Sequence, residues 1–282
     1  MLAVIGGSGL YNLSDLKVEK EHVLDTPFGV PSDKIIQGQL AKNTILFLSR
    51  HGKGHKLLPH EVNYRANIFA LKKLGASKVL SVSACGSLKE KIKPGDLALV
   101  DQYFDHTRGK REYSFFGRGI AAHVSTANPA CPELSKDIIK ASKDADINIH
   151  TNATYGCVEG PRLGTRAESF FLKDSAKCDV VGMTNIPEVF LAREAQLAYC
   201  TLCLVTDYDC WMDDPSQHVT VEKFFEVYSQ TVNKAKSVLN SLASLELSKT
   251  PEDIAYALKF SVMTADKNIS AEQKQWLEVL RA

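Results

Sequence analysis

The sequence has almost no net charge. In its 282 residues, 34 Lys and Arg stand against 33 Asp and Glu, which gives a formal charge of +1. Without an excess of one sign, no overall electrostatic field attracts nucleic acid or an anionic membrane surface. We therefore expect a small-molecule partner, with neither nucleic acid nor membrane.

Long apolar runs are also missing. The apolar opening, Leu2–Ile5, has no cationic leader and continues into glycines, unlike the apolar stretch of a signal peptide. No later run approaches the length of a membrane span. The seven Cys are an odd number and lie among apolar neighbours, which suits reduced thiols and a cytoplasmic location.

Metal and redox motifs are scarce. Cys200 and Cys203 have CxxC spacing, but they lie in the apolar run 199–206, where neither thiolate would be stabilised. We expect them to pack in the core. Three other candidates, which lie among glycines and lack flanking Cys pairs, are His51, His55 and His60. Since metal-binding motifs space their ligands differently, we expect no metal ion.

What the sequence does contain is a regular alternation of strand and helix patterns. Helical spacing appears at Glu61–Leu74, Cys131–Asp144 and Pro187–Leu197. This alternation predicts an α/β fold with a central sheet that helices cover on both sides. The short apolar runs that predict strands are Leu2–Ile5, Thr44–Leu48, Lys78–Ser83, Leu97–Asp101, Asp179–Met183 and Thr201–Thr206.

The C-terminal part differs in character. Val219–Leu247 predicts one long helix or two with a break, and the polar stretch after it has helix starts at Pro251 and Ser270. No repeat or low-complexity linker marks a second domain. We assign one domain to residues 1–248 and an added helical tail to residues 249–282, which packs on its own subunit or at a subunit contact.

Three predicted strands end in small or polar residues. These ends are Ser83-Ala84-Cys85-Gly86, Gly182-Met183-Thr184 and Asp207-Tyr208-Asp209. Because open α/β sheets bind ligands at the carboxyl ends of their strands, we expect these residues to share one site.

Two further segments suit an anion. In Gly6-Gly7-Ser8-Gly9, backbone amides and the Ser8 hydroxyl can surround one, although a plain tight turn remains an alternative. Arg50 can bind phosphate through two hydrogen bonds, and His51 beside it can exchange a proton with the same anion. The alternative for Arg50 is a surface ion pair.

Asp207 and Asp209 form the most informative pair. If the backbone stays extended, both carboxyl groups face the same way and repel, so one holds its proton to higher pH. A protonated carboxyl group can donate to N7 of a departing adenine while the other carboxylate accepts from the exocyclic amine. The alternative is a solvated acidic turn that continues into Asp213 and Asp214.

Taken together, these segments resemble the purine nucleoside phosphorylase family, in its methylthioadenosine phosphorylase branch. The matching motifs follow the family's order over roughly residues 1–245 and are far more specific in combination than singly. They are Ile5-Gly-Gly-Ser-Gly-Leu10, Asp25-Thr-Pro-Phe-Gly29, Arg50-His51-Gly52, Val62-Asn-Tyr-Arg-Ala-Asn67, Ala84-Cys-Gly-Ser87, Glu159-Gly-Pro-Arg162, Arg166-Ala-Glu168, Gly182-Met-Thr184, Pro187-Glu188 and Thr206-Asp-Tyr-Asp-Cys-Trp211.

The resemblance implies the nucleoside phosphorylase fold, a single domain with a central mixed, partly barrel-like sheet flanked by helices. It implies phosphorolysis of S-methyl-5'-thioadenosine to adenine and 5-methylthioribose-1-phosphate, a salvage reaction for purines and methionine. Inorganic phosphate is then a co-substrate, and no cofactor is needed. The family forms homotrimers in which a neighbouring subunit completes each site.

The resemblance also assigns roles to residues. Met183 would lie against the ribose, the 207–209 segment would contact the base with Asp207 and Asp209 as catalytic acids, and His123 would reach the 5' group of a neighbour's substrate. An apolar pocket for the methylthio group would come from Val221, Phe224 and Phe225. The implied phosphate site consists of Gly6, Ser8, Arg50, His51, Ser83, Ala84 and Thr184.

The sequence departs from the family pattern at a few positions. Leu163, followed by Gly164, stands where the family often has an aromatic residue against the purine, and Ser8 and Ser83 stand where Thr is frequent. We expect Leu163 to cover the base, with altered affinity but retained activity, and Gly164 to affect specificity at the 5' group.

Three other functions remain as alternatives. A phosphorylase for adenosine or for 6-oxopurine nucleosides would differ mainly at the acid pair. A hydrolase would not need the anion site of Ser8, Arg50 and His51, and a non-catalytic nucleoside-binding module would have no use for phosphate beneath the sugar.

Overall fold

The computed structural model describes residues 1–7, 10, 15–213 and 221–282, and for residues 221–225 the backbone alone. Within these ranges nine strands form one sheet: β1 (Leu2–Gly6), β2 (Lys17–His22), β3 (Ile35–Leu40), β4 (Asn43–Ser49), β5 (Lys78–Ser87), β6 (Leu97–His106), β7 (Ile149–Val158), β8 (Val180–Gly182) and β9 (Ala198–Tyr208). The α-helices are α1 (Tyr64–Lys73), α2 (Pro132–Asp144), α3 (Arg166–Phe170), α4 (Glu188–Glu194), α5 (Val221–Leu242), α6 (Glu252–Ala255) and α7 (Ala271–Arg281). A π-helical turn, Phe171–Ser175, follows α3, and a 3₁₀ turn, Asp266–Asn268, precedes α7.

Five of the strands close into a barrel. Their order is β5-β8-β7-β6-β9, and β9 returns to pair with β5, with Lys78 opposite Ala198 and Ser87 opposite Tyr208. The remaining strands extend from β5 as an arm in the order β1-β4-β3-β2. Parallel pairs such as β5 with β9 stand beside antiparallel pairs such as β6 with β9. The expected mixed, partly barrel-like sheet is confirmed.

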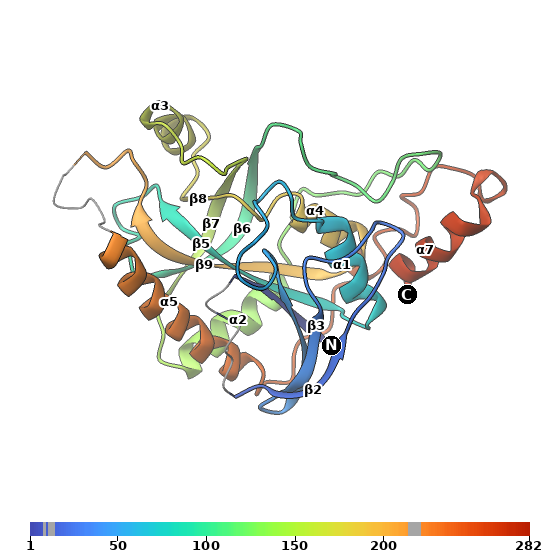
Figure 1. Ribbon diagram of the computed structural model, residues 1–282, viewed down its shortest axis with the longest axis horizontal. Helices are drawn as coiled ribbons and strands as arrows, with labels where there is room; N and C mark the ends of the chain where they lie inside the picture. Colours follow the sequence, from blue (N-terminus) through green and yellow to red (C-terminus); the bar gives the residue numbers. More distant parts are fainter. Residues whose placement is uncertain (8–9, 11–14, 214–220) are drawn as a thin grey trace.

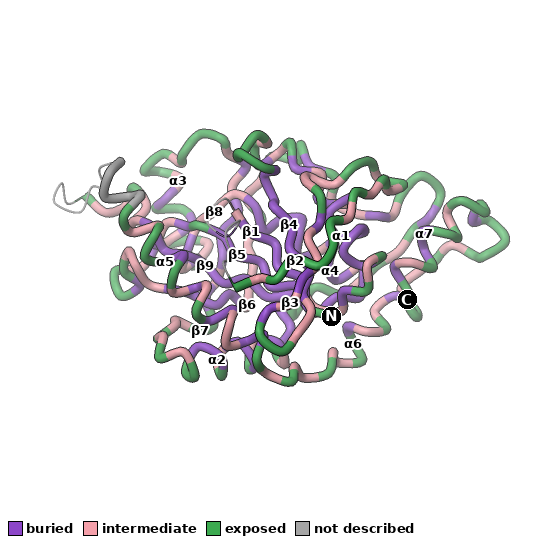
Figure 2. The backbone as a smooth tube through the Cα atoms, turned by 60° about the horizontal axis from the view of Figure 1, so that its bottom comes forward, coloured by how far each residue is buried: buried purple, intermediate pink, exposed green. Residues whose placement is uncertain are grey.

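Helices cover the sheet on two sides (Figure 1). Helices α1, α4 and α7 share one apolar core through Ile68, Leu191 and Leu277. Helices α2 and α5 belong to the other core through Leu134 and Val238. The buried backbone runs through the middle of the molecule, where the strands lie (Figure 2). The prediction of an α/β fold with helices on both faces is confirmed.

The strands whose sequences are continuous apolar runs are predicted correctly. All six predicted strands are present, although the one expected at 179–183 covers only Val180–Gly182. Three strands were missed: β2, β3 and β7. The sequence of β2 is mostly charged and nearly all exposed, so no apolar pattern indicates it, and antiparallel pairing with β3 holds it in place.

The predicted helices are present, but each is shorter than predicted. Helix α1 begins at Tyr64 rather than earlier because the Asn63 side chain accepts a hydrogen bond from the amide of Ala66 and caps it. The long C-terminal segment forms one helix, α5, without a break. Helix α3 was missed, although Thr165 and Glu168 form a capping box at its start.

The C-terminal tail packs on its own chain. Leu258 and Leu280 are fully buried, and the Leu258 amide donates to Gln196 Oε1 at 3.0 Å. The backbone of the tail also pairs with an earlier loop, because the His123 amide donates to the Ser261 carbonyl at 2.9 Å. The predicted helix starts near 251 and 270 are confirmed. In the described ranges, no helix combines the length and the apolar character needed to cross a bilayer.

The packing of β4 can be tested at Leu48, which has no exposed surface. Replacing it with Ala removes apolar contacts and leaves a cavity, so we expect Leu48→Ala to lower the free energy of unfolding by about 2 to 5 kcal/mol. The control is Val18→Ala on exposed β2, for which a change within about 0.5 kcal/mol is expected. Urea denaturation measures both, and equal effects would contradict this account of the core.

Candidate active site

One cavity of about 340 Å³ lies where β5 and β9 meet the ends of β1, β4 and β8. This volume suits a small-molecule ligand. Most of the predicted site residues line it: Arg50, His51, Ser83, Ala84, Leu163, Gly164, Met183, Thr184, Asp207 and Asp209. Gly7 of the predicted anion loop and Gly86 of a predicted strand end line it as well, and so do His55 and Tyr228, which had no predicted role in ligand binding.

Other predicted residues are not brought into the cavity. Gly6 is a buried residue of β1 but does not line it, and His123 lies on the loop that pairs with the C-terminal tail. Tyr208 is turned away, because successive side chains of a strand alternate; its hydroxyl donates to the Glu90 carbonyl at 3.0 Å. Ser8 lies outside the described residues, as do the side chains of Val221, Phe224 and Phe225.

Arg50 has 1 % of its surface exposed and is held by five hydrogen bonds. Its Nε and Nη2 donate to the two carboxylate oxygens of Glu188 at 2.7 and 2.9 Å, and Nη2 also donates to Ser81 Oγ at 2.5 Å. Burial alone would lower the pKa of Arg50, but the Glu188 carboxylate outweighs it and raises the pKa above its ordinary value. The alternative of a surface ion pair for Arg50 is therefore wrong, because its partner is internal.

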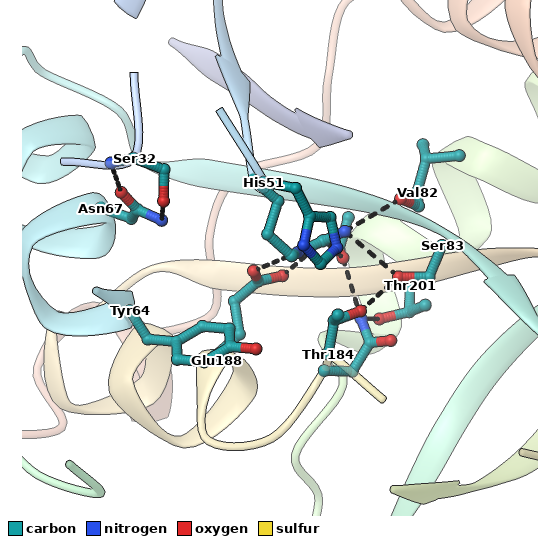
Figure 3. Close-up of polar contacts among 12 residues, drawn as sticks. Ser32, His51, Tyr64, Asn67, Val82, Ser83, Thr184, Glu188 and Thr201 are labelled. Atoms are coloured by element: carbon teal, nitrogen blue, oxygen red, sulfur yellow. Dashed lines mark hydrogen bonds and ion pairs between the residues drawn. The ribbon is translucent and has the colours of Figure 1, made fainter. Parts of the chain in front are cut away.

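The remaining edge of the guanidinium faces the cavity wall. Its Nη1 donates to the Val82 carbonyl at 3.2 Å and to Ser83 Oγ at 3.3 Å, and Ser83 Oγ lies 3.0 Å from Thr184 Oγ1. Figure 3 shows these contacts beside His51. Hydrogen-bond donors from three separate segments thus meet at one end of the cavity, as an oxyanion site requires.

A second layer of hydrogen bonds fixes this arrangement. The Asn185 amide nitrogen lies 2.9 Å from Ser81 Oγ, from the Tyr199 hydroxyl and from Thr201 Oγ1. The Tyr199 hydroxyl in turn donates to Glu188 Oε1 at 2.8 Å. Because Ser81 and Glu188, which accept from the guanidinium, are themselves held by Asn185 and Tyr199, this network holds the guanidinium in one orientation.

His51 is mostly buried at the same end. Its Nδ1 lies 2.8 Å from the Leu57 carbonyl oxygen, and its ring stacks on that of His55 with centroids 4.3 Å apart. Burial, and next the positive charge of Arg50, lower the pKa of His51 to about 4. The imidazole is therefore neutral near pH 7.

The acid pair lies at another part of the cavity. Gly86 leaves room for it: a Cβ on Gly86 would lie 3.3 Å from both Asp207 Oδ2 and Asp209 Cβ. Burial, helped by the charge of Asp209, raises the pKa of Asp207 to about 6, although Thr206 Oγ1 donates to its Oδ1 at 2.6 Å. The predicted rise in the pKa of one of the two acids is present in Asp207. Burial contributes more to this rise than the repulsion between the two carboxyl groups, from which it was predicted.

The 159–164 segment forms part of the cavity rim. Gly160 has φ of +65°, and a Cβ there would lie 2.6 Å from Met183 Sδ, so glycine lets Met183 approach. Glu159 anchors the segment, since it accepts from Arg111 Nε at 2.9 Å. Leu163 lines the cavity yet is 80 % exposed, so it lies at the mouth.

Residues 1–243 match the Phosphorylase superfamily. The chain belongs to this superfamily. It is 43 % identical to the S-methyl-5'-thioadenosine phosphorylase of Geobacter sulfurreducens, over 99 % of this chain and 97 % of the relative. It is 45 % identical to the protein of the same name from Saccharolobus solfataricus, over 94 % and 96 %.

Solved structures agree with the family assignment. A crystal structure of a methylthioadenosine phosphorylase from an Antarctic soil metagenomic library superimposes with a TM-score of 0.93 at 44 % identity, covering 99 % of this chain and 98 % of the other. A methylthioadenosine phosphorylase from Schistosoma mansoni in complex with adenine gives a TM-score of 0.81 at 36 % identity, covering 86 % and 90 %. The nucleoside phosphorylase fold is therefore confirmed for this phosphorylase.

Two residues around the site were not given these roles from the sequence. Glu188 stands in a motif typical of the family, but nothing in the sequence identifies Arg50 as its partner. His55 was considered only as a metal ligand, whereas here it stacks on His51. In the part of the chain that the structure describes, no group of three or more His, Cys, Asp or Glu side chains is arranged to hold a metal ion.

The ion pair can be tested by removing its negative charge. Glu188→Gln leaves the Arg50 charge buried without a counter-ion, so we expect the free energy of unfolding to fall by about 3 to 5 kcal/mol. The double variant Arg50→Met with Glu188→Leu should recover most of the loss, because no buried charge remains.

The matched control is Glu112→Gln, which removes the exposed partner of Arg65 and should change the stability by less than about 1 kcal/mol. Urea denaturation of all three variants provides the comparison. A Glu188→Gln protein as stable as the wild type would contradict the structural role given to this pair.

Proposed function

We propose that this protein cleaves S-methyl-5'-thioadenosine with inorganic phosphate and releases adenine and 5-methylthioribose-1-phosphate. The observation that carries the proposal is that one cavity holds an oxyanion site and, apart from it, a buried acid pair. A nucleoside of suitable length places its ribose between these two groups. The names of the relatives support the choice of substrate.

In this proposal the end of the cavity that Arg50, Ser83 and Thr184 line holds phosphate beneath the sugar. The Thr184 hydroxyl donates to the phosphate, while Arg50 and Ser83 line the cavity and orient Thr184 through a chain of hydrogen bonds, with Ala84 at the wall of the cavity. The family motif also assigns Ser8 to this site, and Gly6, which does not line the cavity, would act only through the backbone of the loop that follows it. Met183 lies beside the ribose. Phosphate held in this way is positioned to attack C1' as the base departs.

The other end of the cavity protonates the base. Asp207, whose pKa is raised, donates a proton to N7 of adenine, and Asp209 accepts a hydrogen bond from the exocyclic amine. Positive charge that develops on the ribose is then stabilised by phosphate on one side while the base leaves as a neutral group on the other. This chemistry needs neither a metal ion nor an organic cofactor, since phosphate is a co-substrate.

The 5' group is assigned to a site shared between subunits of a homotrimer. His123 does not line the cavity of its own chain, and the exposed position of Leu163 leaves the mouth open to a neighbour. His123 of an adjacent copy would close it, together with Val221, Phe224 and Phe225. The seven free cysteines suit a cytoplasmic enzyme.

The first test is adenine release from methylthioadenosine and from adenosine, each with and without phosphate. We expect release that depends on phosphate and a higher kcat/KM for methylthioadenosine. Equal values for the two nucleosides would indicate a general adenosine phosphorylase. Release without phosphate would indicate a hydrolase, and no release with any nucleoside would indicate a binding module.

The acid pair predicts a change of base preference. Asp207→Asn removes the proton that adenine N7 receives and supplies an amide, so we expect kcat/KM for methylthioadenosine to fall by roughly 100-fold or more. Activity on inosine should rise relative to activity on adenosine. Asp144→Asn, an exposed acid on α2, is the control. An unchanged ratio of inosine to adenosine cleavage would disprove the assignment.

The raised pKa of Asp207 also predicts a pH dependence. Since the acid form is the active one, kcat/KM should decline as pH rises through about 6, and Asp207→Asn should lack this decline.

The raised pKa of Asp207 also affects the free energy of unfolding. The folded pKa lies above the unfolded one, so the contribution of Asp207 is complete below the unfolded pKa, near 4, and is lost as pH rises through about 6. Steady-state kinetics and unfolding against pH measure the two effects.

A further inference from the structure

The hydrogen bond of His51 fixes which of its nitrogens carries a proton. A carbonyl oxygen only accepts, so Nδ1, which lies 2.8 Å from the Leu57 oxygen, must be the N–H donor. In a neutral imidazole the other nitrogen, Nε2, then has a lone pair and no hydrogen. Outside residues 8–9, 11–14 and 214–225, no side chain or backbone group forms a hydrogen bond with Nε2. His51 therefore offers an acceptor to the cavity that it lines.

The surroundings of His51 keep it in this neutral form. Burial disfavours a positive charge most, and the Arg50 guanidinium and the stacked His55 ring disfavour it further; together they outweigh the Leu57 carbonyl, which favours the charge. Glu188 favours the charge, but its carboxylate is already bound to Arg50 through both oxygens. His51 thus differs from the usual anion-binding histidine, which donates from a protonated ring.

Ser83 and Thr184, which line the same cavity, offer donors. Arg50 Nη1 donates to Ser83 Oγ, which leaves the Ser83 hydrogen free to bond Thr184 Oγ1, 3.0 Å away. The Thr184 hydrogen is then free to bond an anion. Because Glu188 compensates the Arg50 charge, hydrogen-bond direction rather than net positive charge selects the ligand here.

We propose that this site selects oxyanions that carry a proton: hydrogen phosphate or hydrogen arsenate donates its O–H to His51 Nε2 and accepts from the Thr184 hydroxyl. Sulfate has a similar size and the same charge as hydrogen phosphate but has no hydrogen to donate. It therefore places a lone pair against the lone pair of Nε2. This inference rests on the proposed function, since it concerns the co-substrate of the same site.

Direct binding of anions to the intact protein tests the inference without nucleoside. Isothermal titration calorimetry with phosphate, arsenate and sulfate at one ionic strength should give similar affinities for the first two. Sulfate should bind at least about tenfold more weakly, as expected for one lost hydrogen bond to a charged group. Equal affinities for sulfate and phosphate would overturn the inference.

Proton exchange provides a second readout. At mildly alkaline pH, phosphate titrations in two buffers that differ in ionisation enthalpy should show almost no proton uptake, because the ligand brings its own proton. Uptake that approaches one proton per site would mean that His51 becomes charged and donates, and would also overturn the inference.

Variants separate His51 from the other anion contacts. The amide of His51→Gln can turn either its oxygen or its NH₂ group to the anion, so phosphate affinity should fall while sulfate affinity does not, and their ratio should approach one. The matched control, Ser83→Ala, removes the hydroxyl that pairs with Thr184 and should weaken the binding of both anions while it preserves their ratio. A ratio that His51→Gln leaves unchanged would refute the inference.

The experiments distinguish a failure of the proposed function from a failure of this inference. If wild-type protein releases no base with phosphate or arsenate, the phosphorolysis proposal is wrong. If it releases base with phosphate but binds sulfate equally well, only the selection for a protonated oxyanion is wrong.

Discussion

The ion pair between Arg50 and Glu188 is the interaction on which the site depends. The two residues are 138 positions apart in the sequence and both are almost completely buried, one after β4 and the other at the start of α4. A buried charge pair is stable only when its geometry is good and its remaining hydrogen-bonding groups have partners. Every N–H of Arg50 has an acceptor, since Ser81, Val82 and Ser83 supply the rest. β4, β5 and α4 are therefore fixed to one another at the anion site.

This constraint also determines the charge of the site. With Arg50 paired internally, its positive charge is not available in full to a ligand, and the neighbouring hydroxyls of Ser83 and Thr184 contribute donors rather than charge. An anion is thus recognised by where donors and acceptors point. Such a site depends on the orientation of a few side chains, which the Asn185 and Tyr199 network maintains.

The sequence predicts the parts of this structure that local patterns determine. Continuous apolar runs identified strands such as β5 and β9, and small or polar residues at their ends identified most of the cavity lining. Local patterns do not indicate closure of the barrel, which only the family resemblance implied, because closure depends on pairing between β5 and β9, whose residues are far apart in the sequence. For the same reason the sequence indicated that Arg50 binds an anion but not that Glu188 holds it. Tyr208 was misplaced because the motif was treated as a unit, whereas side chains alternate along a strand.

Burial explains how the two ends of the cavity acquire opposite hydrogen-bonding roles. In water near pH 6 an aspartate is ionised and accepts, while a histidine is largely protonated and donates. Removal from water disfavours the charged form of each, so it raises the pKa of Asp207 to about 6 and lowers that of His51 to about 4. Near pH 6 about half of Asp207 is then protonated and can donate, while His51 is neutral and can accept, within one cavity. A departing base needs a donor and a hydrogen phosphate ion needs an acceptor, so a single physical effect prepares both groups for the reaction.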